Sequence, residues 1–351
     1  MSNLLLPNLL KRPVSRDLLT LPEYVLYFSS RFNSLSFDNF ASLSNWNKIT
    51  GTDSETGQVW DGKSATYPNG NSGNLATIFT GVNLLNDITQ PINSSNHTSY
   101  GASTVINAAG PDGPNENIMR LELLDSGKIP TGNNSAFGGQ IWLGFLRIAS
   151  STSPLPADIS PICITYYCKL GTFVNNLTDG QIQILINLKT GGYNGSYGGD
   201  SRLTARIVRV GSSLRFQLAH DHGANGADAG ITVTPYGATF PNSASDGGYY
   251  HWMNTNSNVD VPVDTWFKLE MWVDHTGWAM LAIDDAVVIV QKGVTIGEYE
   301  LPFGRLFVAG VYTDHAPANG SVGQVDLCRM DISNYPAAGS VLRQEILNRL
   351  F

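Results

Sequence analysis

From residue 118 onward, short apolar segments follow one another, and each is bounded by Gly, Asn, Asp or Pro. Segments of this length, rich in Val, Ile, Leu and aromatic residues, are typical of β-strands. A helical pattern appears only in the last turns of the chain. The sequence therefore predicts an all-β fold, with strands at residues 118–124, 140–148, 162–170, 181–188, 203–210, 214–220, 231–234, 266–273, 278–283, 286–291, 306–312 and 325–332.

Alternation within these segments indicates which faces of the sheets are buried. In residues 266–273, apolar side chains alternate with Lys268 and Glu270. Residues 182–188 repeat the pattern, with polar side chains at Gln181, Gln183 and Asn187. Successive side chains of a strand point to opposite faces, so each segment predicts one core face and one solvated face. Antiparallel sheets of this kind build a two-sheet sandwich of the jelly-roll type.

Composition and charge exclude several classes of protein. Only 14% of the 351 residues are charged, which disfavours coiled coils and helical bundles. The formal net charge of −8 would repel a phosphate backbone, so we expect no nucleic-acid partner. No apolar run reaches the roughly 20 residues of a membrane span, so no membrane insertion is expected.

The beginning of the chain does not have the pattern of a secretory signal. Lys11 and Arg12 follow the first apolar run, whereas a signal peptide has its positive charges before it. A protein made in the cytoplasm keeps its thiols reduced. Cys163 and Cys168 are five positions apart in one predicted strand, so they face opposite sides and cannot form a disulfide.

Apolar segments at both ends flank the predicted sandwich of residues 36–335. Residues 1–35 form a predicted N-terminal arm whose residues 1–31 carry four basic and two acidic side chains. Residues 336–351 form a predicted C-terminal helix with Ser340 as its N-cap. Either element docks on its own sandwich or on a neighbouring subunit, and the apolar residues that would make such contacts are Leu5, Leu9, Leu18, Leu21, Leu342, Ile346 and Leu350.

Residues 261–287 resemble late strands of the concanavalin A-like lectin/glucanase superfamily. Thr265-Trp266 leads into an apolar strand, and a hairpin follows with Asp284-Asp285 where the superfamily usually has Asp-Gly. Residues 306–312 and 324–332 resemble the last two strands of the same jelly roll. The resemblance implies a sandwich of this superfamily, which includes lectins, glycoside hydrolases, polysaccharide lyases and viral attachment or decoration proteins.

The resemblance also implies residues for a polysaccharide lyase site. Three of its strand motifs are matched in part by Arg120, Gln140 and Tyr312. Arg120 and Gln140 would neutralise the uronate carboxylate, and Tyr312 would transfer the proton. The usual His, second Arg and Lys are replaced here by Trp142, Leu124 and Val308. The paired-carboxylate run of the superfamily's hydrolases is absent from the sequence.

Two further patterns bear on ligands. His220-Asp221-His222 has a spacing compatible with a metal, but no third ligand is evident, so neither a metal nor another cofactor is predicted. Aromatic residues in a predicted loop, Tyr249, Tyr250 and Trp252, suit either sugar stacking or a protein interface. A glycan could also contact the polar sheet face that contains Gln181, Gln183 and Asn187.

Taken together, these patterns favour a non-enzymatic structural component of a bacteriophage virion, either a capsid decoration protein or a tail attachment protein, made in the host cytoplasm. Its expected partners are copies of itself or other virion proteins, bound through the arm and the helix, and a polysaccharide. The alternatives are a carbohydrate-binding lectin module and a polysaccharide lyase with a jelly-roll fold.

Overall fold

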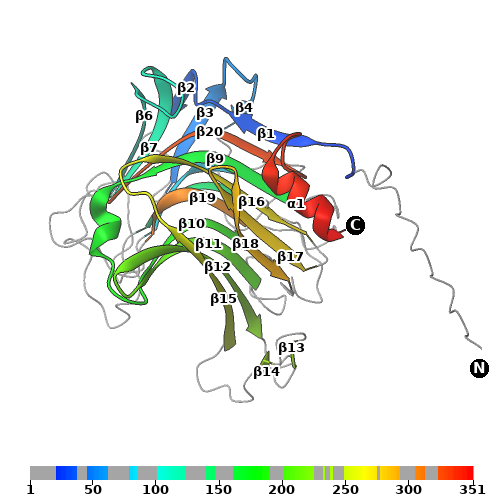
Figure 1. The fold of residues 1–351 in the computed structure, drawn as a ribbon. Coiled ribbons are helices and arrows are strands. Elements are labelled where there is room, and N and C mark those ends of the chain that lie inside the picture. The colour runs from blue at the N-terminus through cyan, green and yellow to red at the C-terminus, as the bar shows by residue number, and fades with distance from the viewer. Residues whose placement is uncertain are drawn as a thin grey trace, which may run out of the picture.

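The computed structural model describes residues 21–37, 46–61, 79–85, 101–123, 140–146, 161–189, 201–224, 232–233, 238–239, 249–274, 277–292, 305–312 and 323–350. In this part of the chain, antiparallel strands form two large sheets that pack face to face (Figure 1). In spatial order, the eight-stranded sheet contains β18 (Ala286–Lys292), β17 (Trp278–Ile283), β16 (Trp266–Val273), β9 (Ile162–Leu170), β20 (Gly323–Ser333), β7 (Glu116–Leu123) and β6 (Gly101–Ala108), with β1 (Leu26–Ser30) also paired to β20. The ten-stranded sheet contains β15 (Tyr249–Asp260), β12 (Ser213–Ala224), β11 (Ser201–Val210), β10 (Ile182–Lys189), β19 (Arg305–Tyr312), β8 (Gln140–Leu146), β5 (Phe79–Leu85), β3 (Trp46–Thr52) and β2 (Leu35–Phe37), with β4 (Val59–Asp61) paired to β3. A small hairpin of β13 (Thr232–Val233) and β14 (Ala238–Thr239), a 3-10 helix at Thr172–Asn176 and the helix α1 (Val341–Leu350) complete the elements.

The core lies between the inner faces of the two sheets. Phe216 of β12 and Phe267 of β16 meet edge to face, with ring centroids 5.5 Å apart. Alternate residues on both sheets, such as Leu218 and Leu269, are completely buried in the same cluster. The predicted antiparallel two-sheet sandwich of the jelly-roll type is therefore confirmed.

Every segment predicted as a strand contains one in the structure. Sequence reasoning missed β1 and β2, which lie in and at the end of the segment assigned to the arm, and it missed β3 to β6 because residues 36–115 are rich in Gly, Asn, Ser and Thr and give no clear alternation. It also assigned residues 249–252 to a loop, which is wrong. These residues begin the edge strand β15, which continues through an Asn-rich stretch of low strand preference and pairs with β12 along its length.

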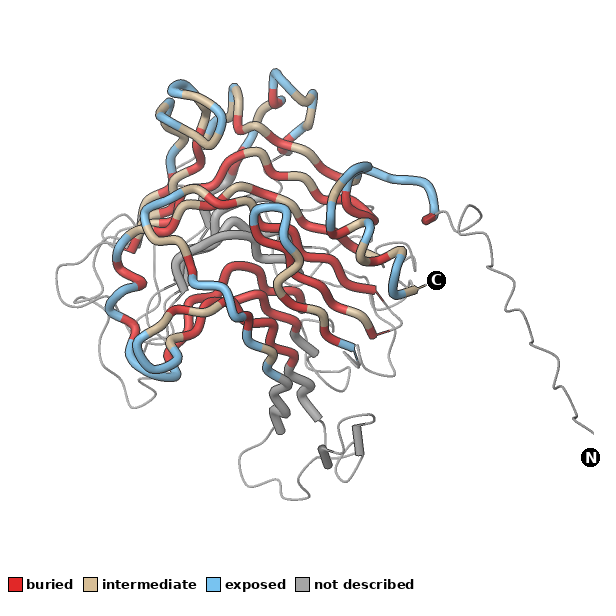
Figure 2. The backbone as a smooth tube through the Cα atoms, viewed as in Figure 1, coloured by how far each residue is buried: buried red, intermediate tan, exposed pale blue. Residues whose placement is uncertain are grey.

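The predicted solvated face of β16 is wrong at its C-terminal half. Glu270 and Trp272 point away from the core, yet their exposed fractions are 2% and 0%. Figures 1 and 2 show α1 lying over this end of the sheet, where the strands are buried. Beneath α1 lies a second apolar cluster, here called the helix cluster, which consists of Leu21, Cys163, Trp272, Met280, Ala282, Tyr335, Leu342 and Ile346.

The predicted solvated face of β10 is also wrong. Residues 181–188 are all buried, and Gln183 is completely so. β10 lies between β11 and β19 inside the ten-stranded sheet, and both of its faces are covered. The alternation of polar and apolar residues correctly placed the strand but not its surroundings.

Both terminal elements differ in part from their predictions. Residues 26–30, within the predicted arm, form β1 and pair with β20. The C-terminal helix is confirmed, and the Ser340 hydroxyl accepts a hydrogen bond from the Leu342 amide at 3.1 Å, as its predicted N-cap role requires. No helix in the described residues is long and apolar enough to cross a membrane.

The predicted hairpin turn at Asp284-Asp285 is confirmed. Both residues have positive φ, 48° and 60°, as a two-residue turn matched to the twist of the strands requires. The cysteines are free thiols, with Cys163 in the helix cluster and Cys168 in the core. They therefore lie on opposite faces of β9, as predicted.

Candidate assembly site at the N-terminal strand

The chain is first fixed to the sandwich at residues 21–30. Leu21 is buried in the helix cluster. The Asn334 side chain then holds the next residues, because its Oδ1 accepts from the Val25 amide at 2.8 Å and its Nδ2 donates to the Glu23 carbonyl at 2.7 Å. β1 follows and pairs with the end of β20. Residues 21–30 are therefore held against the sandwich from Leu21, beside α1, to the end of β1.

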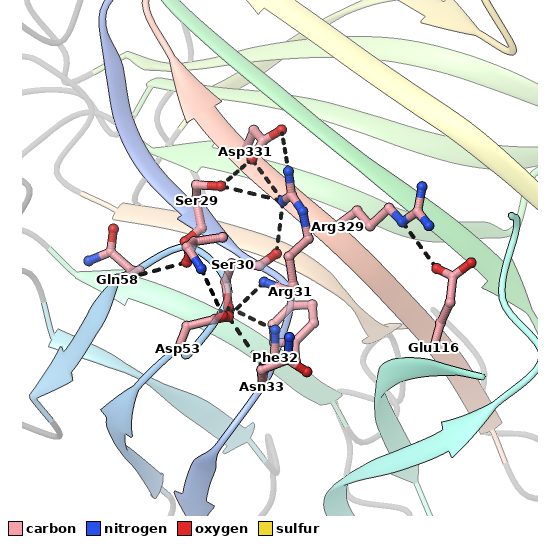
Figure 3. Close-up of polar contacts among 11 residues, drawn as sticks. Ser29, Ser30, Arg31, Phe32, Asn33, Asp53, Gln58, Glu116, Arg329 and Asp331 are labelled. Carbon is pink, nitrogen blue, oxygen red and sulfur yellow. Dashed lines mark hydrogen bonds and ion pairs between the residues drawn. The ribbon is translucent and has the colours of Figure 1, made fainter. Parts of the chain in front are cut away.

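An ion pair holds the end of β1 to β20 (Figure 3). Ser29 lies opposite Asp331 in the ladder, and its hydroxyl donates to Asp331 Oδ1 at 2.6 Å. Arg31 Nη1 donates to the same oxygen at 3.0 Å. Both side chains of the pair are partly exposed, so its contribution to stability is small, and the pair mainly fixes the direction in which the strand ends.

Asp53 ties the turn after β3 to the residues after β1. Its carboxylate is completely buried and accepts hydrogen bonds from the Ser30 hydroxyl and the Arg31 amide, both at 2.7 Å. The amides of Glu55 and Thr56 donate to the other oxygen at 3.1 and 3.3 Å. Burial raises the pKa of Asp53, but these hydrogen bonds outweigh it and hold the pKa below its ordinary value.

Aromatic residues form the floor of this site. Phe28 of β1 packs edge to face on Trp60 of β4, with ring centroids 5.1 Å apart. Phe32 packs on the same indole at 6.1 Å and is almost completely buried, although its φ of 59° lies in the left-handed region. The Phe32 amide donates to the Ser30 hydroxyl at 3.1 Å, which supports this unusual backbone.

Arg329 closes the other side of the site. It lies at a β-bulge in β20 with a φ of 52°, and its Nε donates to Glu116 at 3.1 Å. The same guanidinium contacts Asp112 and lies 5.9 Å from the centre of the Tyr167 ring. Burial raises the pKa of Glu116 above its ordinary value. Arg329 thus fastens the β6–β7 hairpin to β20.

This arrangement is suited to holding a segment of chain rather than to catalysis. Asp53 and Asp331 both accept hydrogen bonds from groups of the same chain, and Arg31 and Arg329 both pair with carboxylates of the same chain. A catalytic acid or base would need access to a substrate proton. The site fixes residues 21–31 to the sandwich.

Comparisons with known proteins give similarity of fold alone. No family model matches this chain, and no curated protein matches its sequence. Among solved structures, the endo-β-1,4-glucuronan lyase of the fungus Trichoderma reesei matches 74% of this chain and 92% of its own, with 10% identity and a TM-score of 0.41. The cellulose induced protein Cip1 matches 72% of this chain and 91% of its own, with 13% identity and a TM-score of 0.37.

Botulinum neurotoxin binding domains are also similar in structure. The domain from neurotoxin DC, solved in complex with rat synaptotagmin II, has 10% identity and a TM-score of 0.37, with 79% of this chain covered. This chain spans about half of such domains, 49% in the first match and 48% in the DC complex.

The residues predicted for a lyase site are not brought together. Gln140 and Tyr312 are paired across β8 and β19 in the ten-stranded sheet. Arg120 lies on β7 in the eight-stranded sheet, where its neighbours Met119 and Leu121 face the core. Its guanidinium therefore points outward, and it forms a two-point ion pair with Asp326 at 2.8 and 2.9 Å. The ion pair with Asp326 gives Arg120 a structural role, so its place in the partial motif needs no substrate carboxylate to account for it.

The other predicted residues fall into four groups. Gln181, Gln183 and Asn187 are buried, so they do not form an exposed sugar-binding face. Leu21, Leu342 and Ile346 are buried in the helix cluster, and Leu350 packs against it, so these four contact their own sandwich. Tyr249, Tyr250 and Trp252 lie on the edge strand β15, whereas Leu5, Leu9 and Leu18 lie outside the described residues.

Sequence reasoning missed the residues that anchor β1. Asp53 begins the segment Asp-Ser-Glu-Thr-Gly, which is typical of a turn in which Asp bonds to its own backbone. That signal could have located the turn. It could not have shown that the same carboxylate binds Ser30 and Arg31, more than 20 positions earlier in the chain.

Proposed function

We propose that this chain is a non-enzymatic structural component of a bacteriophage virion, in which residues 1–20 bind a neighbouring subunit. The proposal covers a capsid decoration or tail attachment protein, made in the host cytoplasm. The observation that carries it is the anchor at residues 21–31, because a fixed origin lowers the ordering cost that the preceding segment pays when it binds a neighbour.

The composition of residues 1–20 supports this role. They are rich in Leu and carry Lys11, Arg12 and Arg16 against Asp17 alone, whereas the whole chain has a net charge of −8. A basic, apolar segment is complementary to the acidic surface of a second copy or of a related virion protein. The apolar residues of α1 are already covered by their own sandwich, so the N-terminal segment is the terminal element proposed for assembly.

Deletion of residues 1–20 tests the proposal. We expect the full chain to be an oligomer and the shortened chain a folded monomer, since the deletion leaves Leu21 and β1 in place. Light scattering after size exclusion gives the masses, and circular dichroism with thermal melting checks the fold. Equal masses for the two proteins would contradict assembly through this segment.

A lectin-like role is a second candidate, supported by the aromatic residues on β15. Tyr250 and Trp252 are two positions apart on this edge strand and pair with Gly223 and Asp221 of β12. Aromatic residues spaced along an edge strand suit stacking against successive sugars of a polysaccharide.

Trp252→Ala tests this candidate against a panel of polysaccharides. We expect a polysaccharide that raises the melting temperature of the parent chain to lose this effect in Trp252→Ala and to keep it in Trp266→Ala, because the control residue lies on the other sheet. The lectin-like role fails if no polysaccharide shifts the melting temperature, or if both variants respond as the parent does.

A further inference from the structure

The N-terminal anchor and the C-terminal helix meet in the helix cluster, and Figures 1 and 2 show residue 21 beside α1. Leu21 is buried in this cluster together with Leu342 and Ile346 of α1. The five residues that follow Leu21 are all exposed, so Leu21 alone is buried among residues 21–26. The apolar part of the anchor before β1 therefore depends on a cluster to which α1 contributes.

The chain between β20 and α1 holds the exposed residues that follow Leu21. Asn334 Oδ1 accepts a hydrogen bond from the Val25 amide at 2.8 Å, and the Asn334 amide donates to the Val25 carbonyl at 3.1 Å. Both backbone groups of Val25 are thus bonded to one residue, seven positions before α1 begins.

This connecting chain is itself fastened to the helix cluster and to α1. The Ser333 hydroxyl donates to the Tyr335 carbonyl at 2.7 Å, and the Tyr335 ring stacks on Trp272. Arg343 of α1 reaches back, and its Nη1 donates to the Pro336 carbonyl at 3.0 Å. The contacts that hold Val25 and the contacts that hold α1 therefore lie on one short stretch of chain.

The start of α1 is fixed to β16. The Ser340 hydroxyl donates to Glu270 Oε1 at 3.2 Å, and Lys268 forms an ion pair with the same carboxylate at 3.1 Å. Glu270 is almost completely buried. A carboxylate at a helix N-terminus is also favoured by the helix dipole. α1 therefore has a specific docked position on the sheet.

α1 depends on docking for its helical structure. It has ten residues, and isolated helices shorter than about 12–15 residues are barely stable in water. When α1 leaves the sheet, Leu21 loses Leu342 and Ile346 as cluster neighbours, and its apolar surface becomes exposed. Docked and undocked α1 thus correspond to a held and a released Leu21.

We propose that docking of α1 regulates the N-terminal segment. Docked α1 holds residues 21–25 against the sandwich, and undocked α1 releases them as far as β1. The inference rests on the proposed function, because the regulated segment is the one proposed to bind a neighbouring subunit. Since coupling between two sites is reciprocal, fixing the N-terminal segment on a neighbour also stabilises docked α1.

Hydrogen exchange of the Val25 amide in the full chain tests the coupling from α1. We expect Leu342→Ala to speed exchange of this amide by at least about fivefold, the lower end of the range for coupled sites, while the amides of β9 in the middle of its sheet keep their protection. Val341→Ala is the matched control, because Val341 lies on the same helix but is 45% exposed. It should leave the Val25 amide as in the parent chain. Ile346→Val is a milder change with the same expected direction, should Leu342→Ala fail to fold.

The reverse substitution tests reciprocity. Leu21→Ala should speed exchange of the α1 amides by a factor similar to the one that Leu342→Ala produces at Val25. Glu23→Ala, an exposed change two positions away, should leave the α1 amides protected. Unchanged exchange at Val25 in the α1 variants, or unchanged exchange of α1 in Leu21→Ala, would overturn the regulation, whatever the oligomeric state.

Light scattering on the same variants separates this inference from the proposed function. If the full chain is an oligomer, Leu342→Ala should lower its mass at a given concentration and Val341→Ala should not. An oligomer of unchanged mass in Leu342→Ala would contradict regulation by α1. Coupled exchange in a chain that is a monomer would support the link between α1 and the N-terminal segment and reject the assembly role of that segment.

Discussion

Replacing Asp53 with Ala is expected to lower the free energy of unfolding by about 3 kcal/mol. The substitution leaves the Ser30 hydroxyl and the Arg31 amide without their acceptor in a buried place, along with the amides of Glu55 and Thr56. A hydrogen bond to a charged group contributes about 1.5–3 kcal/mol, and abandoned buried donors add a penalty, although such terms are not additive. Urea unfolding followed by tryptophan fluorescence measures the change.

The dependence on pH identifies the carboxylate as the cause. Because the pKa of Asp53 is lowered in the folded protein, its contribution is complete above the ordinary pKa of an Asp and is lost as the pH falls through the lower folded value. The difference in stability between the parent and Asp53→Asn should therefore shrink in acid. Glu55→Ala, an exposed change in the same turn, should stay within about 0.5 kcal/mol at every pH. A constant difference for Asp53→Asn would assign the effect to shape rather than charge.

Replacing Trp272 with Ala is expected to cost about 3–5 kcal/mol and to loosen the C-terminal helix. The indole is completely buried under α1 and stacks on Tyr335 with ring centroids 6.0 Å apart. Its loss leaves a cavity between β16 and the helix residues Leu342 and Ile346. Denaturant unfolding gives the energy, and hydrogen exchange reports protection along α1.

Trp266→Ala is the matched control for this effect. Trp266 lies on the same strand and the same outer face, but it is partly exposed and packs outside the helix cluster. We expect it to cost about 1 kcal/mol, mainly through its hydrogen bond to the Ala109 carbonyl at 3.1 Å. Similar losses for the two variants, or unchanged protection of α1 in Trp272→Ala, would mean that α1 does not depend on this indole.

The sequence predicted where the strands lie but not which of their faces are covered. Alternation in β16 and β10 located both strands, because the period of two is local information. It assigned Glu270 and Gln183 to solvated faces, and both are buried, since covering by a terminal helix or by distant chain is not local. For the same reason the apolar residues of α1 indicated docking but not the surface on which the helix docks.

The candidate site was less predictable than the fold. Its hydrogen bonds join positions such as Ser29 with Asp331 and Val25 with Asn334, which are about 300 residues apart. No spacing rule reaches that far in a single sequence. The partial lyase motif shows how a match of residue types can mislead. Arg120 fits the motif, but it lies on the other sheet from Gln140 and Tyr312 and pairs with Asp326, so the three residues do not form one site.

The anchoring of β1 also has a consequence for the order of events during synthesis. β1 can pair only after β20 has been translated, and Leu21 and Trp272 are covered only when α1 has left the ribosome. Contacts between such distant positions form late, because the intervening loop must first be closed. A growing chain therefore lacks the rigid origin of residues 1–20 until translation is almost complete. Under the proposed function, residues 1–20 would be anchored for binding only in a finished subunit. Assembly would therefore follow the completion of folding.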